Sequence, residues 1–218
     1  MTAMPLGLGS MAGKSRPETG VQLRNEPSRG SDGQVTAELE ASTGNVIAIS
    51  FYSPWPLVTG AFYDVESRDR SNGEGCYVQV TPLEGSKSLE GLPSSFFTEQ
   101  ILSSKGRFGA YGVPVNVKMV SSRMEGAIRV LEFTFSALSP TYAEVPRHAV
   151  VAVTAPEGAK EVVMLVGTAS AARWNKGASK LLSEATSSFR ATTFKPARAK
   201  KAKRNIFAVE EEEEEEQA

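Results

Sequence analysis

Few residues of this chain have the types and spacing that catalysis requires. Its 218 residues include one cysteine, Cys76, and one histidine, His148. A cysteine nucleophile needs a base beside it, and these two residues form the one Cys-His pair that the sequence could supply. We interpret Cys76 instead as a small apolar residue in a strand, because free cysteines are usually buried. A single cysteine excludes an intrachain disulfide, and a single histidine excludes a His-rich zinc site.

A second candidate for chemistry is the carboxylate pair Asp64 and Asp69, with Arg68 between them. Acid–base catalysis requires both carboxylates to face one substrate. On a strand, residues an odd number apart point to opposite faces, so these two would diverge. We therefore interpret the three residues as an ion-paired sheet edge. The printed sequence also contains no GxSxG, P-loop or GxGxxG motif, and we predict that the protein is not an enzyme.

The elements that must position these residues are mostly short apolar strands separated by turn residues. Such hairpins predict an α+β fold with a mostly antiparallel sheet, whose two helices can cover opposite faces. A helix is expected over residues 94–103, with Ser94 or Ser95 as its N-cap. Strands are expected at 46–52, 62–70, 76–81, 115–120, 128–136, 150–154 and 162–167.

A second helix is predicted after Trp174. Its apolar residues recur at helical spacing and form one stripe that faces a core. Trp174 is expected to anchor the start of this helix to the sheet, because large aromatic side chains dominate core burial. The stripe consists of Ala178, Leu181, Leu182, Ala185 and Phe189.

The sequence predicts one folded unit between two tails. Residues 1–43, rich in Gly, Ser and Pro, are expected to form a disordered arm, and residues 44–194 the domain. Residues 195–218 hold a basic run and then unbroken glutamate, which predicts a disordered tail. The acidic run can neutralise the basic one, so we expect no nucleic-acid binding. No run of 18 apolar residues exists, so we expect no membrane span.

The second half of the chain resembles the PsbP family, the extrinsic proteins of the thylakoid lumen. The resemblance lies in an Arg-His pair before a strand, a turn, a second strand, Arg-Trp at the head of a helix, and Ser-Phe at its end. The first half is similar more loosely, through Phe51, Tyr52 and Pro54, and through Tyr63-Asp64-Val65 followed by Arg68-Asp69. The residues of the second half are Ser139 to Tyr142, Pro146-Arg147-His148, Pro156-Glu157-Gly158, Arg173-Trp174 and Ser188-Phe189.

The resemblance implies an α-β-α sandwich and a non-enzymatic role in the chloroplast thylakoid lumen. It implies docking on photosystem II, in stabilisation, assembly or support of oxygen evolution; photosystem I and the NADH dehydrogenase-like complex are alternative partners. Residues 1–33 show no apolar export segment of the kind that a lumenal protein would carry. The protein would be peripheral to the membrane. We expect Arg147, His148, Arg173 and Lys176 to contact acidic loops of the partner.

The resemblance also implies a divalent cation, calcium, manganese or zinc, at His148. The carboxylate that assists this histidine in the family falls where this chain has Ala171 or Ala172. One imidazole alone makes a weak site, since closed metal sites need several ligands. Two further hypotheses stay open: a metal- or small-molecule-binding domain on the same fold, and a soluble interaction module outside the plastid.

Overall fold

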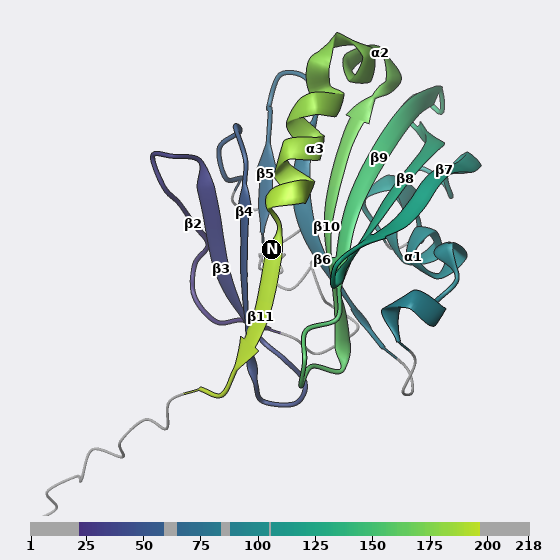
Figure 1. Cartoon of the computed structure of the whole chain (residues 1–218). Helices are drawn as coiled ribbons and strands as arrows, with labels where there is room; N and C mark the ends of the chain where they lie inside the picture. Colours follow the sequence, from purple (N-terminus) through teal and green to yellow (C-terminus); the bar gives the residue numbers. More distant parts are fainter. Residues whose placement is uncertain (1–21, 59–64, 84–87, 105, 197–218) are drawn as a thin grey trace, which may run out of the picture.

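The computed structural model describes residues 22–58, 65–83, 88–104 and 106–196 (Figure 1). Their strands form two antiparallel sheets. The smaller sheet has the order β1-β3-β4-β11, with β2 also paired to β3, and the larger has the order β5-β6-β10-β9-β8-β7. The strands of the smaller sheet are β1 (Gln22–Leu23), β2 (Ser28–Arg29), β3 (Gln34–Glu40), β4 (Val46–Tyr52) and β11 (Arg190–Phe194). Those of the larger sheet are β5 (Glu66–Arg68), β6 (Gly75–Pro82), β7 (Val115–Glu125), β8 (Ile128–Leu138), β9 (Glu144–Thr154) and β10 (Glu161–Ser170).

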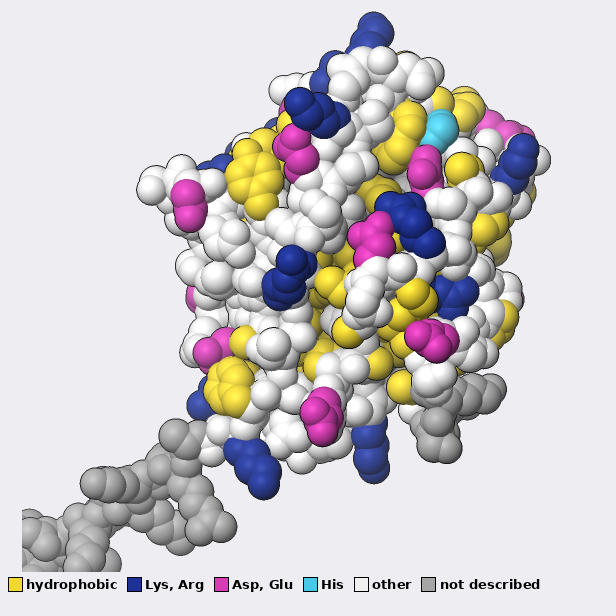
Figure 2. Space-filling model, in the orientation of Figure 1, with side chains coloured by type: hydrophobic (Ala, Val, Ile, Leu, Met, Phe, Trp, Pro, Cys, Tyr) yellow, Lys and Arg dark blue, Asp and Glu magenta, His cyan; other side chains and the backbone are white. Residues whose placement is uncertain are grey.

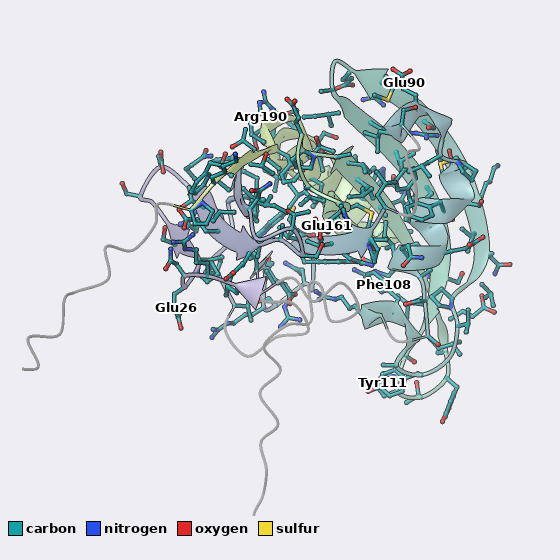
Figure 3. All side chains as sticks on the ribbon, turned by 90° about the horizontal axis from the view of Figure 1, so that it is seen from below. Glu26, Glu90, Phe108, Tyr111, Glu161 and Arg190 are labelled. Atoms are coloured by element: carbon teal, nitrogen blue, oxygen red, sulfur yellow. The ribbon has the colours of Figure 1, made fainter. Side chains whose placement is uncertain are left out.

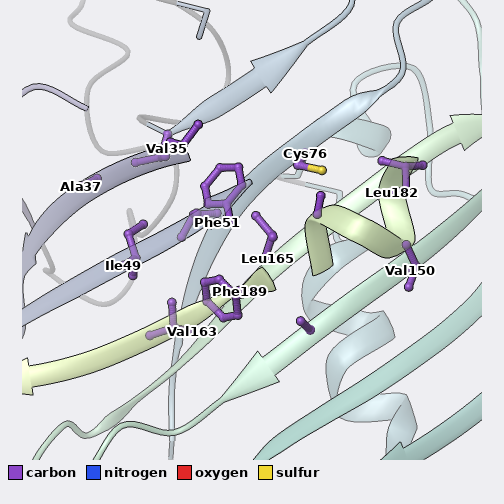
Figure 4. Close-up of a cluster of buried hydrophobic side chains, with 14 of the residues drawn as sticks. Val35, Ala37, Ile49, Phe51, Cys76, Val150, Val163, Leu165, Leu182 and Phe189 are labelled. Carbon is purple, nitrogen blue, oxygen red and sulfur yellow. The ribbon is translucent and has the colours of Figure 1, made fainter. Parts of the chain in front are cut away.

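The two main helices lie on opposite faces of the six-stranded sheet (Figure 1). One core lies between the two sheets and includes Leu182 and Ala185 of α3 and Phe189, which directly follows this helix (Figure 4). The other lies beneath α1, where Phe97 and Ile101 pack against aromatic residues of β8. The helical segments are η1 (Leu89–Gly91), α1 (Ser94–Ile101), η2 (Arg107–Gly109), α2 (Ala171–Arg173), the π-helical η3 (Trp174–Ala178) and α3 (Ser179–Ser188).

A buried carboxylate joins the two sheets. Glu161, at the start of β10, is 1 % exposed. It accepts hydrogen bonds from the backbone N–H and hydroxyl of Ser42, in the turn between β3 and β4, and from the backbone N–H of Lys160. Figure 3 shows Glu161 in the interior of the molecule. These donors satisfy a charge that would be costly to bury alone.

The fold agrees with the expected mostly antiparallel α+β class, but its layers differ from the sandwich around one sheet that the resemblance implies. A second sheet packs against the first, and α3 lies beside it. Part of this sheet comes from the segment predicted to be a disordered arm. In β3, Val35, Ala37 and Leu39 are buried in the core. The folded unit therefore begins before Gly44, and residues 1–21 and 197–218 lie outside the described part of the chain.

Several local predictions are confirmed. Strand β4 has the predicted bounds, and Cys76 is a buried free thiol in β6 whose pKa is raised by desolvation.

The predicted N-cap of α1 is wrong, because Pro93 occupies that position and no side chain caps the helix. The helix after Trp174 begins with a π-helical turn, in which Gly177 has a φ of 104°. Such a φ favours glycine, which lacks a Cβ.

The predicted ion-paired edge at Asp69 is also corrected. The carboxylate near Arg68 is Glu66, 3.6 Å from its Nε. Asp69 accepts hydrogen bonds from the backbone of Ser71 and from both the backbone and the side chain of Asn72. These bonds hold the pKa of Asp69 below its ordinary value. Asp64 lies outside the described residues.

Candidate partner-binding surface

One end of the six-stranded sheet holds all four residues predicted for docking. The register pairs Arg147 with Ser170, the last residue of β10, and His148 follows Arg147 in β9. Arg173 and Lys176 come after Ser170, in α2 and η3. We call this end, where β8 and β10 stop and β7 and β9 start, the α2 end (top of Figure 1).

His148 is held against the helix by an aromatic stack. Its ring lies parallel to the indole of Trp174, with centroids 4.8 Å apart and planes 17° apart. Trp174 packs against the core between the sheets, as predicted for an anchor. The Nδ1 atom of His148 is buried, and no described residue forms a hydrogen bond with it. Figure 2 shows the histidine at the surface beside hydrophobic side chains.

The described residues offer no group of three His, Cys, Asp or Glu side chains that could hold a metal ion. Both alanines at the position of the family's assisting carboxylate, Ala171 and Ala172, lie in α2 and bring no ligand atom from their side chains. A cation at His148 therefore stays a prediction that rests on the sequence resemblance.

Arg173 already has an intramolecular partner. Its Nε and one Nη donate to the two carboxylate oxygens of Glu74 at 2.9 and 3.0 Å. This bidentate pair satisfies Glu74, which is 2 % exposed, and raises the pKa of Arg173. Lys176 is exposed on η3. Of these two cations, Lys176 is therefore the one that reaches a partner without giving up an existing bond.

Arg147 lies in a different setting, at the wall of a cavity of about 290 Å³. Its guanidinium sits over the ring of Phe108, 5.3 Å from the centroid. Arg107 borders the same cavity, and it forms an ion pair with Glu66, which is almost fully buried. Burial, and next the charge of Arg107, lower the pKa of Arg147 to about 10, so the group remains a cation at neutral pH.

Sequence reasoning missed the apolar surface next to this end. Strand β7 is one of the two outer strands of the sheet, and among the described strands it pairs with β8 alone. Nine of its eleven residues are exposed, including several that are apolar. We call these exposed residues and their neighbours the apolar rim: Tyr111, Val113, Val115, Val117, Val120, Met124 and Tyr142. The alternation of Val115 and Val117 was visible in the sequence, but it indicates a strand and not which side of it is covered.

A larger hollow, of about 360 Å³, lies away from all of these residues, on the outer face of the five-stranded sheet. Most of the residues that line it have polar side chains, among them Ser28, Thr36 and Glu38. The guanidinium of Arg190 borders it and already donates to the carbonyl groups of Ser187 and Phe189. We give more weight to the smaller cavity, because a half-buried cation there has no carboxylate partner among the described residues.

The α2 end and the apolar rim together suit contact with another macromolecule. Large exposed apolar side chains at one edge, flanked by the cations Lys176, Lys118 and Arg123, resemble the apolar centre and polar border of protein interfaces. None of the described helices is long and apolar enough to span a membrane.

Comparison with known proteins gives one kind of match. The chain matches no protein-family model and no curated protein. Among solved structures it is similar to cyanobacterial PsbP (CyanoP) from Synechocystis sp. PCC 6803. The sequence identity is 16 %, the match covers 87 % of this chain and 97 % of the other, and the TM-score is 0.43. This is the family named from the sequence, but a likeness of this degree transfers no role to any residue.

Proposed function

We propose that this chain is a PsbP-type accessory protein of the thylakoid lumen. It binds the lumenal side of photosystem II through the α2 end and the apolar rim, and it supports the stability or assembly of that complex without catalysing a reaction. The sequence resemblance between Ser139 and Phe189 supports the family. Its motif residues meet in one unit, in which the Arg147-His148 pair and Trp174 lie side by side.

The observation that carries the docking role is the apolar rim. In β7, Val117 is 46 % and Val120 is 53 % exposed, and Tyr142 nearby is 73 % exposed. Exposed apolar area of this kind gains free energy when a partner covers it, about 25 cal/mol per Å². Scattered apolar residues are ordinary on surfaces, whereas several along one outer strand mark a contact site.

Charge gives the contact its orientation. Lys176 at the α2 end and Lys118 and Arg123 in β7 are exposed cations. Cations at the border of an interface mainly raise the association rate and align the partners, and they act less at high salt. The partner surface would therefore be apolar in its centre and acidic at its border.

The test is co-migration with solubilised thylakoid complexes on a native gel, with the bands identified by mass spectrometry. Purified protein is added to thylakoids washed free of the native copy. We expect it in a photosystem II band and expect Val117→Lys, which places a charge in the apolar rim, to lower its amount at least about tenfold. Ser183→Lys, on the exposed side of α3, is the matched control and should bind normally.

Two results would count against this proposal. Equal binding of the Val117→Lys and Ser183→Lys variants would remove the apolar rim from the contact. Migration of the wild-type protein only as a free species would remove the docking role itself. A band of photosystem I or of the NADH dehydrogenase-like complex would keep the docking role and replace the partner.

A further inference from the structure

The cavity beside Arg147 holds a cation that forms no ion pair within the described part of the chain. Arg147 lies inside the sheet, between Phe135 of β8 and Ser170 of β10. One Nη donates to the hydroxyl of Thr168 at 3.3 Å and, at 3.5 Å, approaches the carbonyl of Gly73. Its Nε is buried and has no hydrogen-bond partner among the described residues. Both acceptors are neutral, and no described carboxylate forms an ion pair with it.

The other charges at this place leave a positive excess. Glu66 is 1 % exposed and forms its ion pair with Arg107, while Arg68 lies 3.6 Å from the same carboxylate oxygen. Glu74 is bound on both oxygens by Arg173. Each of these two carboxylates therefore already pairs with an arginine, although Glu66 does so through Oε1 only. Among the described residues, no carboxylate pairs with the guanidinium of Arg147. A half-buried charge in this state costs free energy that a bound anion would recover.

The walls of the cavity define what kind of anion fits. They are mostly apolar and aromatic: Phe108, Tyr111, Leu138 and Val145 line it together with both arginines. Phe108 and Tyr111 come from η2 and the loop after it, and Figure 3 shows Tyr111 farther out than Phe108. The volume of about 290 Å³ is at the lower end for small-ligand sites.

We propose that this cavity is a binding site for a carboxylate that carries an apolar group, with the carboxylate on Arg147 and the apolar group against Phe108, Leu138 and Val145. The planar guanidinium presents parallel N–H donors that match a planar carboxylate. One unpaired cation calls for a monoanion. A phosphate or sulfate has more oxygen atoms that must accept hydrogen bonds than this apolar lining has donors to supply.

The site goes beyond the docking role and stands without it. The carboxylate has two sources, a free organic acid or the C-terminal residue of a protein chain. Both present the same chemistry to Arg147, so the probes must separate them.

Titration calorimetry tests the proposal on the full chain with neutral and charged pairs of probes. One pair is 3-phenylpropionate and its amide; the other is a tripeptide that ends in phenylalanine, as free acid and as C-terminal amide. We expect each acid to bind at least about tenfold tighter than its amide, because the amide loses the charge-assisted bonds. Tighter binding of the peptide acid indicates a chain terminus, and tighter binding of phenylpropionate indicates a free acid.

Variants then locate the site. Arg147→Gln should remove the preference for the acids, and Arg147→Lys should keep the charge but weaken binding severalfold by losing the planar fork. Lys180→Gln, at an exposed position of α3, is the control and should leave the binding of the acids unchanged. The comparison of acid with amide on the wild-type chain needs no variant and holds even if Arg147→Gln does not fold. Equal binding of acid and amide, no binding of either, or tighter binding of inorganic phosphate or sulfate would overturn the proposal. None of these results would bear on co-migration with thylakoid complexes.

Discussion

Strands β10 and β7 belong to one sheet and each carries three valines, yet they have opposite surroundings. Nine of the ten residues of β10 are buried, whereas nine of the eleven residues of β7 are exposed. β10 has a strand on each side and a core on each face, while β7 has a described strand, β8, on one side and none on the other. The same residue type therefore stabilises the fold in one strand and forms a contact surface in the other.

The difference teaches that strand propensity and burial are separate properties. Valine favours extended backbone in both strands, because a β-branched side chain suits a pleated surface. Position in the sheet then decides whether the side chain is covered. An outer strand also exposes unpaired backbone groups, which proteins blunt with charges and bulges. β7 has both features: the charged residues Lys118 and Arg123, and two register shifts against β8. Its apolar residues are nevertheless exposed.

The largest contrast should appear in thiol labelling. Cys76 is fully buried in β6, and desolvation raises the pKa of its thiol, so it should react only when the sheet opens. A Val117→Cys, Cys76→Ala protein should label with Ellman's reagent on the order of a thousand times faster or more than the wild type. Comparable rates for the two proteins would mean that the six-stranded sheet opens locally at β6.

The next largest effect concerns stability. Leu165 in β10 is fully buried between the sheets, and Leu165→Ala should lower the free energy of unfolding by about 2–5 kcal/mol through lost burial and a cavity. The matched change in β7, Met124→Ala, should stay within about 0.5 kcal/mol. Urea denaturation measures both. A cost at Met124 similar to that at Leu165 would contradict the separation of the two strands.

The sequence predicted the buried centre better than the edges. Strands β4, β6 and β10 follow from apolar runs between turn residues, and Cys76 was placed correctly as a core residue. Strand β9 begins at Glu144, six residues earlier than expected. Its early part contains Pro146, which cannot donate a hydrogen bond to a neighbouring strand. In the structure Pro146 lies beyond the last pair with β10, so among the described strands it pairs with β8 alone.

Other elements gave weaker signals. The alternation of Val35, Ala37 and Leu39 was present, but it follows a Gly- and Ser-rich segment that suggested disorder. Strand β11 has no apolar alternation, and its pairing with β4 comes from the position of α3. Of the site residues, His148 and Trp174 were both singled out from the sequence, but the stacking of their rings was not predicted. Glu74 pairs with Arg173, 99 positions away, and Glu66 pairs with Arg107, 41 positions away. Local sequence patterns cannot predict ion pairs between residues so far apart in the chain.

The smallest predicted effect lies at the other edge of the sheet, in the turn between β5 and β6. Hydrogen bonds from Asn72 and Ser71 lower the pKa of Asp69. A carboxyl whose folded pKa is depressed contributes stability above its unfolded pKa and loses it as pH falls through the folded value. Asp69→Asn should therefore flatten the loss of stability below about pH 4, measured by thermal melts. An unchanged acid slope would show that these bonds do not distinguish the folded from the unfolded state.

The central claim is that β7 is a contact surface, and site-specific crosslinking tests it most directly. A photo-reactive amino acid is placed at position 120 in β7 or at position 183 on the exposed side of α3. Both proteins are then irradiated on thylakoid membranes. We predict a crosslink from position 120 to a photosystem II subunit and none from position 183. Crosslinks of equal yield from both positions, or none from position 120 while the protein remains bound, would contradict the account.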